Sequence, residues 1–241
     1  AGLPPALEGT RIALLSDLHV GMFSRLSRLR RMSAVINREN PDLVVMDGDL
    51  VDDDPFYVPK LLEGFREVRP SIPIYAVLGN HEMYGDPRLA IAALDRSRVD
   101  LLVNRGERVQ RGSANLWLAG ISDFAGRAVK GEPSLAPDIG KALAGRPADA
   151  FTILLSHQPR AFALARRAHI PLTLCGHTHG GQFGMRSLRI TLAGLFLPFD
   201  VGWYERDGVQ LYVTTGAGYW LVPFRFGIPP EIVVIELQRR A

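Results

Sequence analysis

Short apolar runs alternate with amphipathic stretches along most of the chain. Five runs are almost entirely apolar, which is typical of strands buried on both faces. They are Arg11–Leu15, Asp42–Met46, Ile72–Leu78, Phe151–Leu155 and Pro171–Leu174. Apolar residues recur every three positions over Leu26–Val35 among arginines, so this segment is predicted to be an amphipathic helix with a solvated basic face. Pro87–Arg96 and Pro159–Ala168 are predicted as further helices, each with a proline in its first turn.

The rest of the chain has the pattern of short strands and turns. Three strands are predicted at Val99–Val103, Arg108–Gln110 and Leu116–Ala119, with turns at residues 104–106 and 111–113. From Leu188 onward the sequence predicts short β segments that end in a strand over Glu231–Leu237. No repeat or internal linker is visible. We therefore predict one α/β domain over residues 11–241, preceded by a linker over residues 1–10.

Composition narrows the class of protein. Of the 241 residues, 47% are hydrophobic and 22% charged, which excludes a disordered, collagenous or coiled-coil chain. Cys175 is the single cysteine, so an internal disulfide and a thiolate zinc cluster are excluded, and we expect Cys175 in a buried strand. The net charge of +3 comes without a concentrated basic patch, so we expect no nucleic-acid partner.

A side chain able to bind a metal follows each of the five apolar runs by a few residues. These side chains are Asp17, Asp49, Asn80, His157 and His177. Since loops beyond the carboxyl ends of strands share one crevice in an open α/β sheet, we expect the five to meet there. His19 and His179 stand two positions after Asp17 and His177, which lets the side chains of each pair point to the same side. The pattern therefore predicts a metal site.

Histidine usage points to the same place. Five of the six histidines, all except His169, lie in these loops. The segment GHTHGG at residues 176–181 is the most informative, because core packing does not explain two histidines between glycines. His169 follows a predicted helix, and we interpret it as an ordinary residue at the helix C-terminus.

The ordered motifs DLH (17–19), GDLVD (48–52), GNHE (79–82), SH (156–157) and GHTHGG (176–181) resemble the calcineurin-like metallophosphoesterase superfamily. The resemblance implies a two-layer β-sandwich flanked by helices, an α/β/β/α fold, with two metal ions at the sheet edge. It implies one metal bound by Asp17, His19 and His179, a second bound by Asn80, His157 and His177, and Asp49 bridging the two. It also implies that His81 is a catalytic histidine beside the metals.

The donor types agree with this resemblance. Imidazole nitrogens with carboxylate and amide oxygens, and no thiolate, suit Mn, Fe or Zn better than Mg or Ca. Two cations about 3.5–4 Å apart lower the pKa of a shared water and clamp an in-line displacement at phosphorus. We expect hydrolysis of a phosphate mono- or diester, or of a pyrophosphate, by a metal-bridging hydroxide, with His81 helping the leaving oxygen. Asp52 either orients His81 or caps the following helix.

The last third of the chain is rich in aromatic residues with arginines between them. It forms either a β-rich part of the core or an apolar lip, in which Leu192–Pro198 and the Tyr219–Trp220 loop face a lipid-like substrate or a membrane. Residues 216–232 resemble a branch of the superfamily often attached to bacterial membranes, some members of which hydrolyse lipid-linked pyrophosphates. The candidate substrate contacts are Tyr219, Trp220 and Arg225.

Two other functions and the location stay open at this point. A metal-dependent nuclease would need a basic, aromatic-lined groove, and a non-catalytic binding scaffold would not need all eight site positions to be filled. The longest uncharged apolar stretch of interest, residues 190–199, has ten residues, short of the roughly 20 that span a bilayer. We expect the protein in the cytoplasm or peripheral to a bacterial membrane. Because the chain begins with Ala1, any N-terminal anchor is expected to lie outside this sequence.

Overall fold

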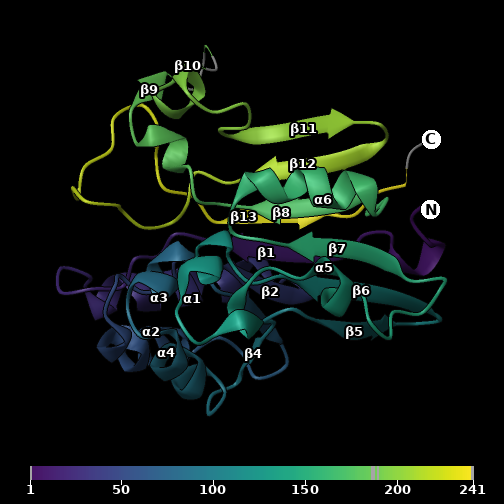
Figure 1. Ribbon diagram of the computed structural model, residues 1–241, viewed down its shortest axis with the longest axis horizontal. Helices are drawn as coiled ribbons and strands as arrows, with labels where there is room; N and C mark the ends of the chain where they lie inside the picture. The colour runs from purple at the N-terminus through teal and green to yellow at the C-terminus, as the bar shows by residue number, and fades with distance from the viewer. Residues whose placement is uncertain (1, 186–187, 189, 240–241) are drawn as a thin grey trace.

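Two β-sheets lie face to face in the computed structural model, which describes residues 2–185, 188 and 190–239 (Figure 1). The first sheet has the spatial order β13 (Val233–Glu236), β1 (Arg11–Leu15), β2 (Leu43–Asp47), β3 (Ile74–Val77) and β4 (Val99–Leu101). The second has the order β11 (Gly202–Arg206), β12 (Val209–Val213), β8 (Leu172–Cys175), β7 (Phe151–Leu155), β6 (Ala114–Gly120) and β5 (Arg105–Arg111). A separate ribbon pairs β9 (Gly184–Met185) with β10 (Ile190–Thr191).

The central strands of both sheets run parallel. Strands β1 to β4 are parallel, with Ile12 opposite Leu43 and Val44 opposite Ile74, and so are β6, β7, β8 and β12. Within these two sheets, antiparallel pairing is confined to β13, β11 and β5, and the separate ribbon of β9 and β10 is also antiparallel. Parallel strands end at a common edge, and in Figure 1 this is the left side, toward which β7 and β12 point. The loops after β1, β2, β3, β7 and β8 therefore emerge together.

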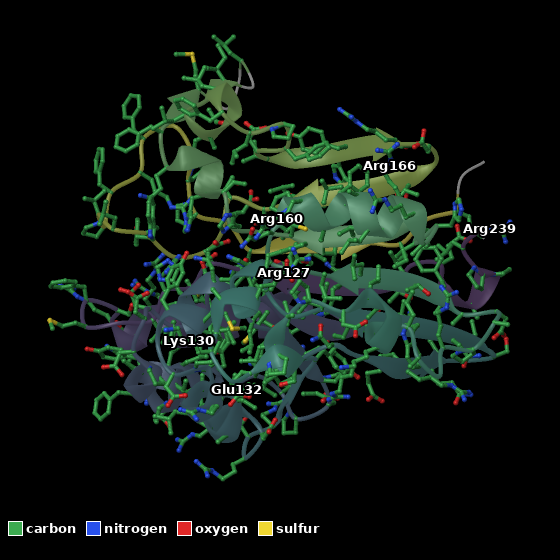
Figure 2. The ribbon with its side chains drawn as sticks, in the orientation of Figure 1. Arg127, Lys130, Glu132, Arg160, Arg166 and Arg239 are labelled. Carbon is green, nitrogen blue, oxygen red and sulfur yellow. The ribbon has the colours of Figure 1, made fainter. Side chains whose placement is uncertain are left out.

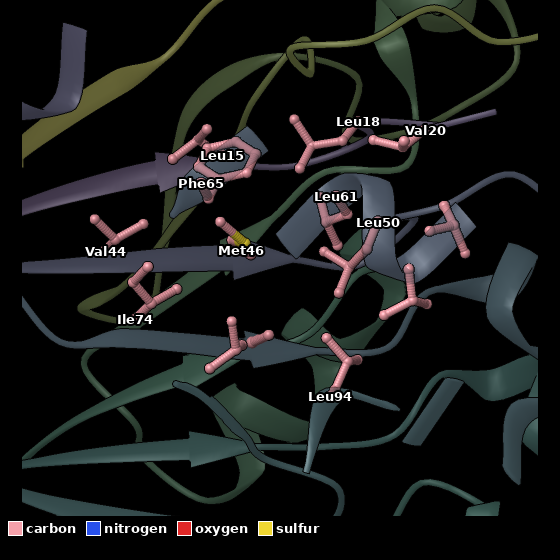
Figure 3. Packing of buried hydrophobic residues seen from close by; sticks show 14 of the residues in the cluster. Leu15, Leu18, Val20, Val44, Met46, Leu50, Leu61, Phe65, Ile74 and Leu94 are labelled. Carbon is pink, nitrogen blue, oxygen red and sulfur yellow. The ribbon is translucent and has the colours of Figure 1, made fainter. Parts of the chain in front are cut away.

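Side chains alternate between the two faces of each sheet. In β1, Ile12 and Leu14 pack between the sheets, whereas Ala13 and Leu15 face the helices. Figure 3 shows the cluster on the helix side, where residues of the first sheet meet Leu61 and Phe65 of α2 (Val58–Phe65). Because both faces are apolar, these strands lack a polar alternation and appear in the sequence as continuous apolar runs.

Helices cover the outer face of each sheet. The α-helices are α1 (Leu26–Glu39), α2, α3 (Asn80–Tyr84), α4 (Pro87–Leu94), α5 (Ile139–Ala142) and α6 (Phe162–Arg167). The 3-10 helices include η1 (Pro5–Leu7), η2 (Pro55–Tyr57), η3 (Phe124–Ala128), η4 (Pro133–Leu135), η5 (Pro159–Ala161), η6 (His179–Gly181) and η8 (Ala193–Leu195). Helices α1, α2 and α4 pack on the first sheet, and α5 and α6 pack on the second. This arrangement confirms the predicted sandwich of two sheets flanked by helices.

Individual elements differ from the sequence-based expectation in three places. The turn predicted at residues 104–106 is wrong, because Arg105 and Gly106 already pair with β6. Helix α2 has no counterpart among the predicted elements. Within residues 1–10, predicted as a linker, η1 places a fully buried Leu7 against the layer between the sheets. In the part of the chain that the structure describes, no helix is both long and apolar enough to span a membrane.

Candidate metal centre

Carboxylates and imidazoles from both sheets meet at the edge where the parallel strands end. Asp17 follows β1 and Asp49 follows β2, whereas His157 follows β7 and His179 follows β8. His157 Nε2 lies 2.9 Å from Asp49 Oδ2 and 3.9 Å from Asp17 Oδ1. His179 Nε2 lies 3.3 Å from Asp17 Oδ1, and His19 Nε2 lies 3.1 Å from His179 Nε2. Ligand atoms that are up to 160 residues apart in the sequence thus share one small volume.

These donors divide into groups that could each hold an ion. Two such groups are Asp17, His19 and His179, and Asp49, His157 and His177; within each, the ligand atoms lie within 4.8 Å of one another. Asp49 joins the groups, because its Oδ2 is also 3.7 Å from His19 Nε2. Asn80 lies on the same rim, since the next residue, His81, donates its backbone N–H to Asp49 Oδ1 at 2.9 Å. The structure therefore brings all seven predicted ligands to one edge.

Five of these residues have a left-handed backbone conformation. Their φ angles are +53° at Asp17, +43° at His19, +47° at Asp49, +74° at His177 and +51° at His179. Residues with a side chain rarely adopt this region, and each such position costs on the order of 1–3 kcal/mol. The sharp turn at each strand end directs the side chain back over the sheet edge. Strain concentrated in this way is typical of functional sites.

Glycines allow the two sheets to approach each other at this edge. Gly48, with φ of +80°, lies beneath the ring of His157, and a Cβ there would be 2.6 Å from His157 Nδ1. Gly176 faces Ser16 and Asp17 across the sheets, where a Cβ would overlap both side chains. The glycines of the GD and GH motifs therefore make room for the neighbouring ligands.

Hydrogen bonds fix the orientation of His157. Its Nδ1–H donates to the backbone carbonyl of Asp47 at 2.8 Å, which directs Nε2 toward the carboxylates. Within the described residues, the buried atom Asn80 Oδ1 has no hydrogen-bond partner, and the buried His157 Nε2 lies 2.9 Å from Asp49 Oδ2 without the geometry of a hydrogen bond. Buried polar atoms are rarely left unpaired, and a metal ion would satisfy both atoms. The residues present therefore fit a metal.

The negative charge of the carboxylates raises the pKa of a neighbouring histidine in the centre. Burial alone would lower the pKa of His157, but Asp49 and Asp17 raise it well above its usual value. Burial lowers the pKa of His177 and of His179 to about 4, so both imidazoles are neutral at pH 7. The pKa of His19 is also raised, because Asp52 and Asp49 outweigh the effect of burial, so in the metal-free protein the protons carried at neutral pH belong to His157 and His19 rather than to those two histidines.

Metal binding is expected to release protons. Because a histidine must lose its proton to bind a metal, Zn²⁺ or Mn²⁺ must displace the proton of His157. We expect at least one proton per protein to be released at pH 7, and metal affinity to fall as the pH is lowered. Calorimetry in two buffers of different ionisation enthalpy measures this stoichiometry. A value of zero would show that His157 is neutral before the metal binds.

His81 lies at the rim of the centre, held by two exposed carboxylates. Its Nδ1 is 2.7 Å from Asp53 Oδ1 and 3.3 Å from Asp52 Oδ1. Of the two roles considered for Asp52, the structure supports contact with His81, because the helix that follows is capped by Asp54, whose Oδ1 accepts the Phe56 N–H at 2.9 Å. Asp53 is the nearer carboxylate, and the sequence pattern did not single it out.

Asp53→Asn is expected to lower the hydrolysis rate roughly tenfold, because Asp53 orients the His81 ring and the loss of such a partner costs about 10- to 100-fold. We expect the lower end of this range of rate effects, because the Asp53 side chain is 65% exposed and water weakens its interaction with His81. Asp54→Asn is the matched control, since this neighbouring carboxylate caps η2 instead. Steady-state rates with unchanged metal content measure the effect. Equal rates for both variants would mean that Asp53 does not orient His81.

One further residue, Glu82, supports the centre from behind. The buried Glu82 accepts the backbone N–H groups of Leu50 and Val51 at 2.8 and 3.0 Å, and that of Gly79 at 2.7 Å, which ties the GNHE loop to the GDLVD loop. Burial, with the charge of Asp49, raises the pKa of Glu82 to about 7. Glu82 is thus a loop anchor, a role that its position next to His81 in the sequence did not indicate.

The candidate substrate contacts lie on one side of the centre. Arg225 donates to the carbonyls of Gly218 and Thr215 at 2.7 Å, and its Nη2 lies 3.1 Å from His179 Nδ1, so Arg225 braces a predicted ligand. Tyr219 is covered by Arg28, whose guanidinium carbon is 4.4 Å from the ring centroid. Trp220 is half-exposed and lines a hollow of about 430 Å³ that also contains His81.

Comparison with known sequences identifies the family. The model of the calcineurin-like phosphoesterase family matches residues 10–181. A transmembrane protein with a metallophosphoesterase domain from Danio rerio is 36% identical over 98% of this chain and 55% of its own length. A Helicobacter pylori metallophosphoesterase is 35% identical over 94% of this chain and 59% of its own length. The chain therefore spans a little over half the length of these curated relatives.

Solved structures show the same fold at low sequence identity. The Thermus thermophilus sulfate thiohydrolase SoxB superimposes with a TM-score of 0.57 at 15% identity, covering 99% of this chain and 58% of its own. A 5′-nucleotidase precursor from the same species has a TM-score of 0.54 at 14% identity, covering 86% and 48%. The solved structures confirm the expected fold, and the family match confirms the resemblance. The chain belongs to the calcineurin-like phosphoesterase family.

Proposed function

We propose that this chain hydrolyses a phosphate mono- or diester, or a pyrophosphate, at a binuclear metal centre. One ion would be held by Asp17, His19 and His179, and the other by Asn80, His157 and His177. The observation that carries the proposal is the position of Asp49 Oδ2, which lies 3.7 Å from His19 Nε2 and 2.9 Å from His157 Nε2. A carboxylate between two donor groups is placed to bridge two ions. Mn, Fe or Zn would suit this donor set.

The two cations, when bound, would supply Lewis-acid stabilisation of phosphoryl oxygens and lower the pKa of a water. Two carboxylates, Asp17 and Asp49, offset only part of the ions' charge, so the site would keep a net attraction for an anionic phosphate. The neutral amide of Asn80 preserves this balance. His81 stands at the open rim, where its imidazole would protonate or stabilise the leaving oxygen.

Metal analysis combined with a hydrolysis assay tests this proposal. Protein reconstituted with Mn²⁺, Fe or Zn²⁺ is expected to hold two ions per chain and to cleave bis-p-nitrophenyl phosphate. One ion per chain would contradict the binuclear assignment. A fully loaded protein that cleaves no ester in a panel of nucleotides, sugar phosphates and phospholipids would favour a binding scaffold. Salt-sensitive binding and cleavage of single-stranded DNA would favour a nuclease.

A lipid-linked substrate at a membrane surface is a second candidate, because exposed apolar side chains surround the site. Most of the large exposed apolar side chains lie in three regions of the chain. These regions are residues 22–23, residues 183–185 together with 190–197, and residues 220–226. Phe23 is 87% exposed, Phe196 80% and Leu221 86%. In Figure 1, β9, β10 and the yellow loop before β13 project on the side where the parallel strands end. Exposed apolar side chains that gather beside a site are typical of surfaces that contact a membrane or another protein.

Basic residues beside this rim favour an anionic bilayer as its partner. Arg25, Arg28 and Arg31 line the same hollow as Met22 and Phe23. Such a combination of apolar side chains and cations is typical of interfacial binding. The protein is expected to sediment with vesicles containing phosphatidylserine. Replacing Phe23 and Leu221 by Ser should abolish this without changing hydrolysis of a water-soluble ester. Equal sedimentation of this variant would contradict a role for the rim.

A further inference from the structure

An apolar hollow of about 400 Å³ opens beside His177 and shares no lining residue with the hollow that His81 lines. Its apolar lining comes from two segments, α6 with Phe162 and Ala163, and the chain before β11 with Leu197, Pro198 and Phe199. Phe199 is held in place by Phe162 and Tyr204, whose ring centroids lie 5.4 and 5.0 Å away. A hollow of this size is within the range of roughly 300–1,000 Å³ that small-molecule sites occupy.

Three arginines stand around this hollow, and two of them have uncompensated charges. Arg166 is paired with Asp207. Within the described residues, the guanidinium groups of Arg160 and Arg206 make no ion pair or hydrogen bond; each rests on an aromatic ring instead. The guanidinium carbon of Arg160 lies 4.0 Å from the centroid of Phe124, and that of Arg206 lies 5.2 Å from that of Phe199. Stacking holds a guanidinium group in place while its N–H donors stay free.

Arg160 lines the same hollow as the predicted ligand His177. It follows the predicted ligand His157 by three residues. Figure 2 shows it at the end of α6 that faces the centre, with Arg127 nearby. Arg127 also lies over the ring of Phe124, at 5.4 Å. Two guanidinium groups therefore share the ring of Phe124, and that of Arg160 belongs to the hollow that His177 also lines.

We propose that the hollow is the subsite for an apolar organic group of the phosphate-ester substrate, and that Arg160 binds a phosphoryl oxygen of the same molecule. This inference rests on the proposed function. The chemistry follows from the lining: phenyl rings, leucine and proline favour an aryl or alkyl group over a sugar. The free guanidinium group of Arg160, in the lining of the hollow, matches phosphate oxygens in charge and geometry. The substrate is thus an ester that joins a phosphate to an apolar group.

Two diesters that differ in one substituent test the subsite. Methyl p-nitrophenyl phosphate and bis-p-nitrophenyl phosphate release the same p-nitrophenolate, but only the second carries another aryl group. Ala163→Trp fills the hollow from α6. For the wild type and for Ala163→Trp, the kcat/KM for the bis-aryl ester is divided by the kcat/KM for the methyl ester. This ratio is expected to be about tenfold lower in Ala163→Trp, because burying an aryl group contributes roughly that factor. Arg167→Trp, an exposed position on the same helix outside the hollow, should leave the ratio unchanged.

Arg160 is tested in the same assay. Arg160→Ala is expected to lower kcat/KM for both esters about tenfold or more, because a charge-assisted hydrogen bond to phosphate is lost. Arg160→Lys should recover part of the loss, and Arg167→Ala should have no effect. Binding of phenylphosphonate to the metal-free protein, measured by calorimetry, should weaken in Arg160→Ala. This readout does not depend on catalysis.

The outcomes separate this inference from the proposed function. If the wild type hydrolyses neither ester, the proposed function fails. If it hydrolyses both and Ala163→Trp keeps the wild-type ratio, the subsite is wrong and the hydrolase stands. Should Ala163→Trp not fold, Ala163→Leu fills part of the hollow and is expected to lower the ratio to a smaller extent. An unchanged ratio there, in a folded and active variant, would also overturn the subsite.

Discussion

Asp49→Ala is expected to lose both metal ions and to reduce hydrolysis by at least about 10³-fold, since bound metals supply several kcal/mol of transition-state stabilisation. The reason is the position of this carboxylate between the two donor groups. Asp49 Oδ2 lies 2.9 Å from His157 Nε2, and Oδ1 accepts the His81 backbone N–H at 2.9 Å. Removal of the side chain deprives both ions of a shared ligand and frees the loop that carries His81.

Metal analysis by mass spectrometry after dialysis, together with the rate on bis-p-nitrophenyl phosphate, measures this effect. Asp95→Ala is the matched control, because it removes an exposed carboxylate beyond the end of α4. Circular dichroism checks the fold of each variant. A folded Asp49→Ala protein that retains two ions would contradict a bridging role for Asp49.

His81→Ala is expected to keep the metals and to lose rate by roughly 10²- to 10⁴-fold, the usual contribution of acid–base catalysis. Its ring packs edge-on against the ring of His19, with centroids 4.5 Å apart, so it lies beside the predicted ligands. Its Nδ1 faces Asp53 and Asp52. Because Nδ1 faces these carboxylates, we expect Nε2 to be the nitrogen that meets a substrate.

The combination of two measurements distinguishes catalysis from metal binding. His81→Ala should retain the metal content of the wild type, whereas Asp49→Ala should not. His169→Ala is a suitable control, since it removes an exposed histidine that belongs to none of the candidate metal groups. A His81→Ala enzyme with wild-type rate and full metal content would show that His81 is not the catalytic acid.

Several elements could be predicted from local pattern alone. The strands over residues 11–15 and 151–155 have the predicted bounds, because both of their faces are buried and every position is therefore apolar or nearly so. Helix α2 could not be predicted in the same way. It begins after Pro55 and consists of only eight residues, too few to show a clear period. The turn at residues 104–106 was wrong because pairing with β6 overrides the preference of Asn and Gly for turns.

The sequence likewise predicts some features of the centre but not others. The order of the motifs indicates which side chains reach the sheet edge, since strand ends in a parallel sheet share that edge. It does not indicate that Asp53 is nearer than Asp52 to His81, or that Arg225 contacts His179. Those pairings depend on side-chain directions in loops and on segments that are 28 to 46 residues apart.

By itself, the sequence determined which candidate metal ligands this protein carries, their order along the chain, and the family to which the chain belongs. Spacing and residue type are local properties, and they are sufficient for those conclusions. Only the tertiary structure decided which charges remain uncompensated and where apolar side chains stay exposed. Arg160 is one of 28 basic residues in the sequence, but it is distinguished by its position on Phe124 beside an apolar hollow. Packing of the two sheets creates that position, because it brings loops from distant parts of the chain to a single edge.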